Sequence, residues 1–261
     1  MKTLYKILLL LIALLPISAE AAQQDTIRVR VMTYNLRFGE LATLEDLAAH
    51  IRSFKPDFVA LQEVDVHTDR ERAPHQKGKD FIGSLAYNTG MFGLYAKTID
   101  YHGGYYGIGI LSKYPYEKVE KTLLPNPMKN EQRALLEGVF DMDGDTVVFA
   151  CTHLDVQKES TRNIQAEYIC NHFKNHKYPV ILGGDFNARH YSKAIVEIMN
   201  GSWFPVTNGD MTYSAWNPII KIDHIFVRPM KGWKVVRTQT VNSLLSDHLP
   251  IITDLEYVKS K

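Results

Sequence analysis

The sequence predicts an α/β protein built on two packed mixed β-sheets flanked by helices. Candidate helices separate the strands at the start of the chain, and a long one follows near 158–175. Between residues 91 and 152, strand-like runs instead follow one another with no helix between them. A single parallel sheet would need a crossover helix between each pair of strands, so these hairpin-like runs indicate mixed sheets. No internal repeat, low-complexity tract or linker divides the chain.

The front of the chain is predicted from alternation and capping. Residues 26–34, TIRVRVMTY, alternate as a strand does. Thr43, three residues before Asp46, is typical of a helix cap, and this helix should reach Phe54. The apolar run 57–64 is predicted as the second strand.

Further elements follow in order along the rest of the chain. A buried strand is predicted where an apolar run, residues 180–182, is bounded by Pro179 and Gly183. The other helices are expected near 79–88, 158–175 and 191–200. The other strands are expected near 91–100, 105–112, 116–123, 132–141, 145–152, 222–228, 233–240 and 250–257.

The N-terminal residues have the three parts of a secretory signal peptide. Lys2 and Lys6 precede an apolar run over 7–17, and Ala19-Glu20-Ala21 follows as an A-x-A cleavage site. The run is shorter than the about 20 apolar residues that span a membrane, which disfavours the alternative of an uncleaved anchor. We therefore expect residues 1–21 to be removed, leaving a secreted or periplasmic protein of one domain, 22–261, without stable membrane insertion.

The charge balance and the two cysteines bear on two questions: whether the protein binds nucleic acid and whether it contains a disulfide bond. The chain has 30 Lys and Arg and 29 Asp and Glu, and removing Lys2, Lys6 and Glu20 leaves 28 of each sign. The basic excess typical of nucleic-acid-binding domains is therefore missing, although a local basic groove is compatible with this balance. Export would permit a disulfide between Cys151 and Cys170, but a domain of this size does not need one, and we expect free thiols.

Polar and charged residues gather where the predicted strands end or begin. Each alone is explained by a turn, a surface ion pair or a satisfied core histidine. Together they would place four carboxylates on one rim, and two like charges 4 Å apart repel by about 4 kcal/mol at an effective dielectric of 20. Such a rim favours a hard cation, such as Mg²⁺, Mn²⁺ or Ca²⁺, over structural zinc. The residues are Asn35, Glu63, His153, Asp185, Asn187, Asp223, Asp247 and His248.

Seven segments in order resemble the endonuclease/exonuclease/phosphatase superfamily: TYNLRF, LQEVD, YYGIGILSKYP, THLD, GGDFNA, IDHIFV and SDHLP. The resemblance covers residues 27–257. It implies a four-layer α/β/β/α sandwich with the active site at one edge, so that 22–261 would be a catalytic domain. The implied activity is metal-dependent hydrolysis of a phosphodiester or phosphomonoester by in-line attack of activated water, with Mg²⁺ or Mn²⁺ as cofactor.

The resemblance also implies which residues hold the metal and the water. Glu63 would be the main metal ligand, with Asn35 beside it, and Asp247 would touch the metal or a bound water. Asp185 would orient or deprotonate the attacking water, and Asn187 would help to hold it.

The remaining matched residues would contact the phosphate. His248 would bind the scissile phosphate, and its carboxylate partner Asp223 would favour the imidazolium. His153 would be a phosphate contact or a general acid. Arg133 aligns with a basic residue near the phosphate, and Tyr106 would either line the site or belong to the core.

The substrate class stays open at this level. Nucleic acid, a phospholipid headgroup such as sphingomyelin, an inositol phosphate and a sugar phosphate are all compatible with the motifs. A catalytically inactive phosphate-binding module is the non-enzymatic alternative, because a fold does not fix a function. The charged stretch with Arg70, Arg72, Lys77 and Lys79 would line the cleft or, more commonly, form a solvated loop. We expect a monomer.

Overall fold

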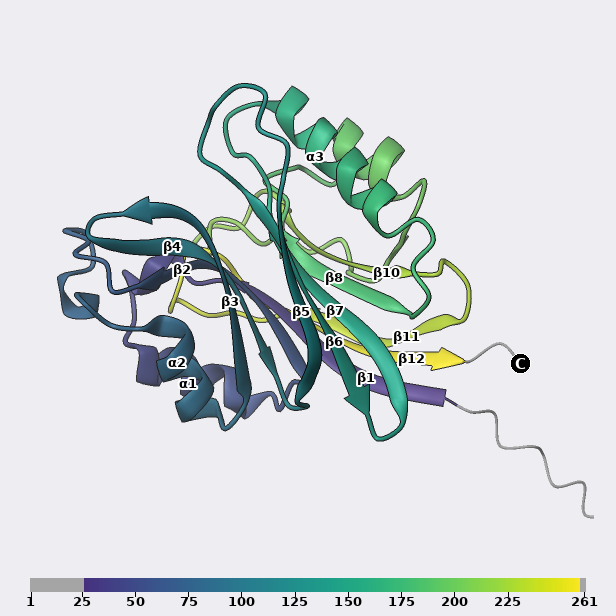
Figure 1. Ribbon diagram of the computed structural model, residues 1–261, viewed down its shortest axis with the longest axis horizontal. Helices are drawn as coiled ribbons and strands as arrows, with labels where there is room; N and C mark the ends of the chain where they lie inside the picture. The colour runs from purple at the N-terminus through teal and green to yellow at the C-terminus, as the bar shows by residue number, and fades with distance from the viewer. Residues whose placement is uncertain (1–25, 259–261) are drawn as a thin grey trace, which may run out of the picture.

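A computed structural model describes residues 26–258 and contains two six-stranded mixed sheets packed face to face, with helices outside (Figure 1). The predicted α/β/β/α sandwich is therefore confirmed. The predicted signal peptide, 1–21, lies outside the described residues. Among the residues described, no helix has the length and apolar character needed to cross a membrane.

Both sheets are built on the same plan. Each contains one parallel pair, β1 with β2 and β7 with β8, whose other neighbours are antiparallel. The first sheet has the order β11 (Trp233–Thr240), β12 (Ile251–Val258), β1 (Thr26–Asn35), β2 (Phe58–Val66), β4 (Gly104–Ser112) and β3 (Phe92–Tyr101). The second has the order β5 (Tyr116–Leu123), β6 (Ala134–Met142), β7 (Asp145–His153), β8 (Val180–Asp185), β10 (Asp223–Arg228) and β9 (Phe204–Pro205).

The helices cover the outer faces of the two sheets. α1 (Leu44–Ser53) connects the parallel pair of the first sheet, and α3 (Glu159–His172) connects that of the second, as parallel strands require. Thr43 caps α1 by accepting from the Asp46 N–H at 3.1 Å, which confirms the predicted cap. The other helices are α2 (Phe81–Thr89), a π-helix η3 (Ala194–Met199) and two 3₁₀ turns, η1 (Arg37–Gly39) and η2 (Pro74–Gln76).

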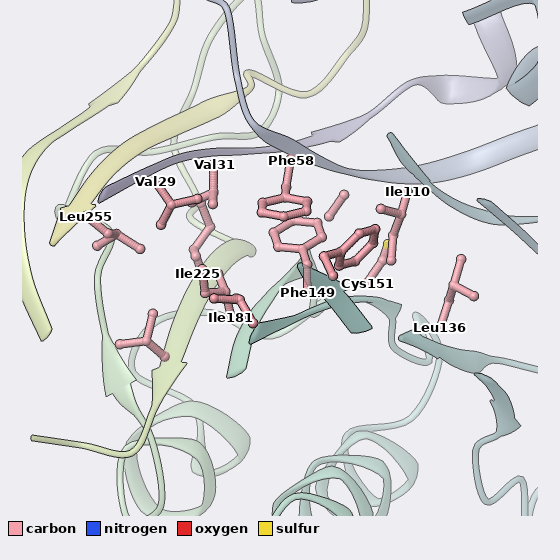
Figure 2. Close-up of a cluster of buried hydrophobic side chains, with 14 of the residues drawn as sticks. Val29, Val31, Phe58, Ile110, Leu136, Phe149, Cys151, Ile181, Ile225 and Leu255 are labelled. Carbon is pink, nitrogen blue, oxygen red and sulfur yellow. The ribbon is translucent and has the colours of Figure 1, made fainter. Parts of the chain in front are cut away.

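Three apolar clusters separate the four layers. Between the sheets, Phe58 of β2 stacks on Phe149 of β7 with ring centroids 5.0 Å apart (Figure 2). In β8, Ile181 points into this central cluster while Val180 and Leu182 pack outward against the helices. This explains why β8 has no polar side chain before Asp185 at its end, since a strand covered on both faces has no polar side. Burial of these side chains supplies most of the driving force for folding.

The two glycines that precede Asp185 set how closely the backbone is packed at the end of β8. A Cβ on Gly183 would lie 3.0 Å from the Ala60 Cβ of the opposite sheet, so glycine lets the two sheets approach here. A Cβ on Gly184 would lie 2.3 Å from the Thr152 carbonyl oxygen of the neighbouring strand. The close approach brings the end of β8 next to the end of β1.

Several smaller predictions can also be compared with the structure. Cys151 and Cys170 are free and buried, as expected. The short helix expected near 191–200 is the π-helix η3, and the two-residue strand β9 and the two 3₁₀ turns were not predicted, because such short elements lack a periodic pattern. In the charged stretch, Arg70 is paired with Asp65 at 2.8 Å and lies outside the active-site cavity described below.

Candidate active site

The ends of three neighbouring strands place the central residues of the site. In the parallel pair β7 and β8, the last residues His153 and Asp185 are in register. β10 runs antiparallel to β8 and begins with Asp223 directly opposite Asp185. From the other sheet, Asn35 at the end of β1 donates through Nδ2 to Asp185 Oδ2 at 3.1 Å. The predicted strand ends therefore converge on one edge of the sandwich.

Glu63 reaches this edge through a β-bulge. The register of β2 against β4 shifts between Gln62 and Val64, and Glu63 between them has a left-handed φ of 58°. A bulge turns a side chain away from the regular alternation of the strand and is common next to active sites. The Glu63 carboxylate accepts a hydrogen bond from Asn35 Nδ2 at 3.2 Å, and burial raises the pKa of Glu63. Asn35 thus lies beside Glu63, as predicted, and presents its amide nitrogen to two carboxylates.

His248 and Asp223 form a buried ion pair. Nδ1 of His248 lies 2.9 Å from Asp223 Oδ2, and Nε2 of the same ring lies 3.7 Å from Asp185 Oδ2. Burial alone would disfavour the charge, but the Asp223 and Asp185 carboxylates outweigh it and raise the pKa of His248 to about 10. The ring is therefore an imidazolium at neutral pH, with Nδ1–H donating to Asp223. Burial, followed by the nearby Asp223 charge, raises the pKa of Asp185 to about 7.

His153 is held in the opposite state, as a neutral imidazole. Its Nδ1 lies 3.0 Å from Arg133 Nη1, and a guanidinium can only donate, so this ring nitrogen must accept. The remaining proton is then on Nε2, which lies 3.4 Å from Asp185 Oδ2. Burial, reinforced by the Arg133 charge, holds the pKa of His153 well below its usual range. Of the two predicted roles, this arrangement favours a neutral phosphate contact over a general acid.

Two other residues at the strand ends organise the loops. Asn187 has a left-handed φ of 48°, its N–H donates to Asp185 Oδ1 at 2.8 Å, and its Nδ2 donates to the Leu154 carbonyl at 3.0 Å. Its backbone N–H therefore helps to hold the Asp185 carboxylate in place. Asp155 accepts from the backbone N–H groups of Gln157 and Lys158 at 2.8 and 2.6 Å just before α3, which is a structural role.

Asp247 is already paired with a cation. The Asp247 Oδ2 lies 2.6 Å from Arg37 Nη1, a contact that no sequence motif predicted. The neighbouring Ser246 donates to the Asn35 carbonyl at 2.7 Å and so fastens the segment before β12 to the end of β1. Asp247 is close to the other carboxylates but has its own counter-charge.

These residues surround a cavity of about 820 Å³. Asn35 and Asp223 lie behind its wall and contact the residues that line it. Tyr106 is buried and also lines the cavity. It is therefore both a core residue and a residue of the site, the two alternatives predicted for it. The predicted residues in the lining are Glu63, Tyr106, Arg133, His153, Asp185, Asn187, Asp247 and His248. The lining also contains residues that no motif indicated, among them Arg162, Arg189, Tyr191, Lys193, Tyr213 and Ile220.

The ligand chemistry of the site fits a hard divalent cation. The candidate ligand atoms of Asp185, Asp223 and His248 lie within 4.8 Å of one another, and because the protonated His248 ring has no lone pair to offer, the carboxylate oxygens would be the metal ligands. Among the residues that the structure describes, none donates a hydrogen bond to the buried Asp223 Oδ1, so this carboxylate keeps one oxygen that a cation could satisfy. The carboxylates of Glu63 and Asp247 face the same cavity, and carboxylate oxygens are preferred ligands of hard cations.

Comparisons with known proteins agree with this geometry. A solved structure of an endonuclease/exonuclease/phosphatase family protein from Bacteroides thetaiotaomicron has a TM-score of 0.74 at 18% identity, covering 90% of this chain and 100% of that one. A mannosyl-6-phosphatase from the same organism has a TM-score of 0.69 at 19% identity, covering 87% of this chain and 99% of that one. At these identities the likeness shows the fold.

A curated relative matches only part of the chain. The RNA-directed DNA polymerase from the mobile element jockey of Drosophila funebris is 30% identical in an alignment 88 residues long, which covers 29% of this chain and 10% of that protein. The chain thus spans about a tenth of the length of this relative. The model of the Endonuclease/Exonuclease/phosphatase family, by contrast, matches residues 32–248, which include every strand end described above. The chain therefore belongs to the endonuclease/exonuclease/phosphatase family, whose members are phosphoesterase and nuclease hydrolases.

Proposed function

We propose that the protein is a secreted or periplasmic phosphoesterase that uses Mg²⁺ or Mn²⁺ to hydrolyse a phosphodiester or phosphomonoester by in-line attack of water. The observation that carries the proposal is the pairing of two differently charged groups in one cavity. Asp185, with a pKa of about 7, lies 3.7 Å from His248, whose raised pKa keeps its ring protonated at neutral pH. A proton acceptor beside a cation is the arrangement that water attack on an anionic ester needs.

Asp185 acts on the attacking water, and His248 binds the phosphate. Asp185 accepts the proton of the attacking water, and Asn187 and Asn35 hold its two oxygens in position. His248 donates to a phosphate oxygen through Nε2–H, the nitrogen not bonded to Asp223. These donors stabilise the negative charge that grows on the phosphate as the bond to water forms.

The second histidine and its arginine complete the phosphate site. His153 donates through Nε2–H, because its Nδ1 accepts from Arg133. Arg133 is 4% exposed and its Nε has no partner among the described residues, so donors remain for an anion. Glu63, supported by Asn35 and Asp247, would hold the metal ion. When bound, this ion would offset charge on the phosphate and the leaving oxygen.

Two other functions are considered, a nuclease and a binding module. A nuclease is the second candidate, because part of the chain matches an RNA-directed DNA polymerase from a mobile element. Against it, the chain lacks the excess of basic residues that is typical of nucleic-acid-binding domains. A binding module without chemistry is the third, and the intact set of strand-end residues argues against it.

A substrate panel with matched variants tests the proposal. Purified protein with Mg²⁺ or Mn²⁺ should hydrolyse bis(p-nitrophenyl) phosphate or p-nitrophenyl phosphate, and EDTA should abolish turnover. Plasmid DNA, RNA, sphingomyelin, inositol phosphates and mannose 6-phosphate then assign the class. Asp185→Ala and His248→Ala should each lose most activity and keep the far-UV circular dichroism of the wild type. Turnover equal to wild type in these variants would overturn the residue assignment, and no turnover of any ester would favour the binding module.

A further inference from the structure

We propose that the cavity contains a second anion-binding subsite, formed by Arg162, Arg189 and Lys193, and that the preferred substrate carries a second phosphate or carboxylate besides the scissile phosphate. This inference rests on the proposed phosphoesterase function and specifies its substrate class.

The topology places the three cations on one wall of the cavity. Arg162 lies in the first turn of α3, shortly after β7 ends at His153. Arg189 and Lys193 lie in the segment after β8, which ends at Asp185. Because β7 and β8 are parallel neighbours, the segments that leave their carboxyl ends emerge side by side. All three side chains line the same cavity as His153 and Asp185.

The charges of this wall are not neutralised by the protein. Elsewhere at the site, Arg133 pairs with Glu131 at 2.9 Å and Arg37 pairs with Asp247 at 2.6 Å. Within residues 26–258, none of the three wall cations has a carboxylate oxygen within 4.0 Å.

One anion shares the wall with these cations. Glu159 also lines the cavity and, in the described part of the chain, likewise makes no ion pair. The wall therefore has three cations for one anion, a net excess of two positive charges. Such an excess beside a cavity attracts a substrate that carries more than one negative charge.

The two arginines are held so that donors stay available. Arg162 Nη1 donates to the carbonyls of Asp155 and Val156 at 3.1 and 3.2 Å, and no described residue accepts a hydrogen bond from its Nη2. Arg189 Nη1 donates to the Tyr191 hydroxyl at 3.0 Å. A guanidinium has five N–H donors in a planar fork that matches phosphate and carboxylate oxygens. Each arginine therefore has several donors free for a ligand.

The size of the cavity also fits a substrate larger than one phosphate. Ligand sites for small organic molecules have volumes of about 300–1,000 Å³, and this cavity has about 820 Å³. Arg133, His153 and His248 supply the donors for the scissile phosphate. The wall cations are then free to bind a second anionic group of the same small molecule.

Competition between two sugar phosphates tests the subsite. Glucose 6-phosphate and glucose 1,6-bisphosphate differ by one phosphate, and each is added as an inhibitor of bis(p-nitrophenyl) phosphate hydrolysis by the Mg²⁺-loaded protein. In the wild type, the inhibition constant of the bisphosphate should be about tenfold or more lower than that of the monophosphate. 6-Phosphogluconate, which adds a carboxylate to the same skeleton, separates the two chemistries of the second anion.

Variants then locate the effect. In the Arg189→Gln/Lys193→Gln double variant, the ratio of the two inhibition constants should fall to about twofold or less, and in Glu159→Gln it should rise. Lys174→Gln/Lys177→Gln removes the same charge near the other end of α3 and serves as the control, in which the ratio should stay as in the wild type.

Each outcome separates the subsite from the proposed function. Equal inhibition constants in an active wild type, or an unchanged ratio in the cavity double variant, would overturn the subsite alone. An equal fall in the control variant would assign the effect to long-range attraction and overturn it as well. A single-stranded oligonucleotide that inhibits more strongly than the bisphosphate would assign the wall to nucleic acid instead. Absence of hydrolysis would overturn both proposals.

Discussion

Replacing Asp223 by Asn removes the buried counter-charge of His248 with almost no change of shape. The two groups are 2.9 Å apart and each is at most 5% exposed. The difference between the ordinary pKa of 6.5 and the value of about 10 corresponds to about 5 kcal/mol in favour of the imidazolium, at 1.36 kcal/mol per pKa unit. Asp223 supplies the largest favourable part of this preference, and Asp185 supplies the next.

Without Asp223 the imidazolium should no longer be favoured in its buried position. The phosphate then loses a charged donor, and we expect kcat/KM of Asp223→Asn to fall about 10²–10³-fold, within the range found for loss of a catalytic proton donor. The fold should survive, because Asn keeps the volume of Asp and the Oδ1 that it replaces accepts no hydrogen bond from residues 26–258.

The assay is hydrolysis of bis(p-nitrophenyl) phosphate at pH 7 with saturating Mg²⁺, with thermal unfolding measured on the same preparations. Asp254→Asn is the matched control, since it removes an ion-paired aspartate, 2.6 Å from Arg30, that lies outside the cavity lining. A folded Asp223→Asn protein with kcat/KM within threefold of wild type would refute the role given to the pair.

Two further predictions concern stability. Phe149→Ala, which removes the ring stacked on Phe58 between the sheets, should lower the free energy of unfolding by about 3–5 kcal/mol in urea titrations, whereas Tyr116→Ala on an exposed edge strand should change it by less than about 1 kcal/mol. The hydrogen bond and charge of Glu137, 2.7 Å away, raise the pKa of His172, so this pair stabilises the fold fully below the ordinary pKa of 6.5 and ceases to do so as pH rises through the raised value. Glu137→Gln should therefore lower the free energy of unfolding by about 1 kcal/mol at acidic pH and by much less in alkali; a constant difference across the pH range would contradict this.

Local sequence patterns were sufficient to predict the helices and strands and many of the residues of the site. Alternation in β1 and the apolar run in β8 predicted strands that the structure contains at the same positions within a few residues. The motifs placed Asp185 at the end of one strand and Asp223 at the start of another, and a residue next to a buried strand must lie at the edge of its sheet. That these two strands are neighbours was shown only by the structure.

Features that depend on contacts distant in sequence were not predictable from local pattern. The bulge at Glu63 arises from a shift of register against β4, and the sequence of β2 itself contains no pattern that predicts this bulge. The pairing of Arg37 with Asp247 joins residues 210 positions apart. Arg189 directly follows the GGDFNA motif and Lys193 lies four residues later, but only the neighbouring segment with Arg162 makes them part of a wall.

The central claim is that residues from Asn35 to His248 form one site that holds a hard metal ion next to a phosphate. Anomalous diffraction from crystals soaked in Mn²⁺ and inorganic phosphate tests it most directly. The account predicts a manganese peak in the cavity, with Glu63 among the ligands and a phosphate within reach of His248 and His153. A peak bound elsewhere, or an empty cavity in protein that hydrolyses phosphoesters, would contradict it.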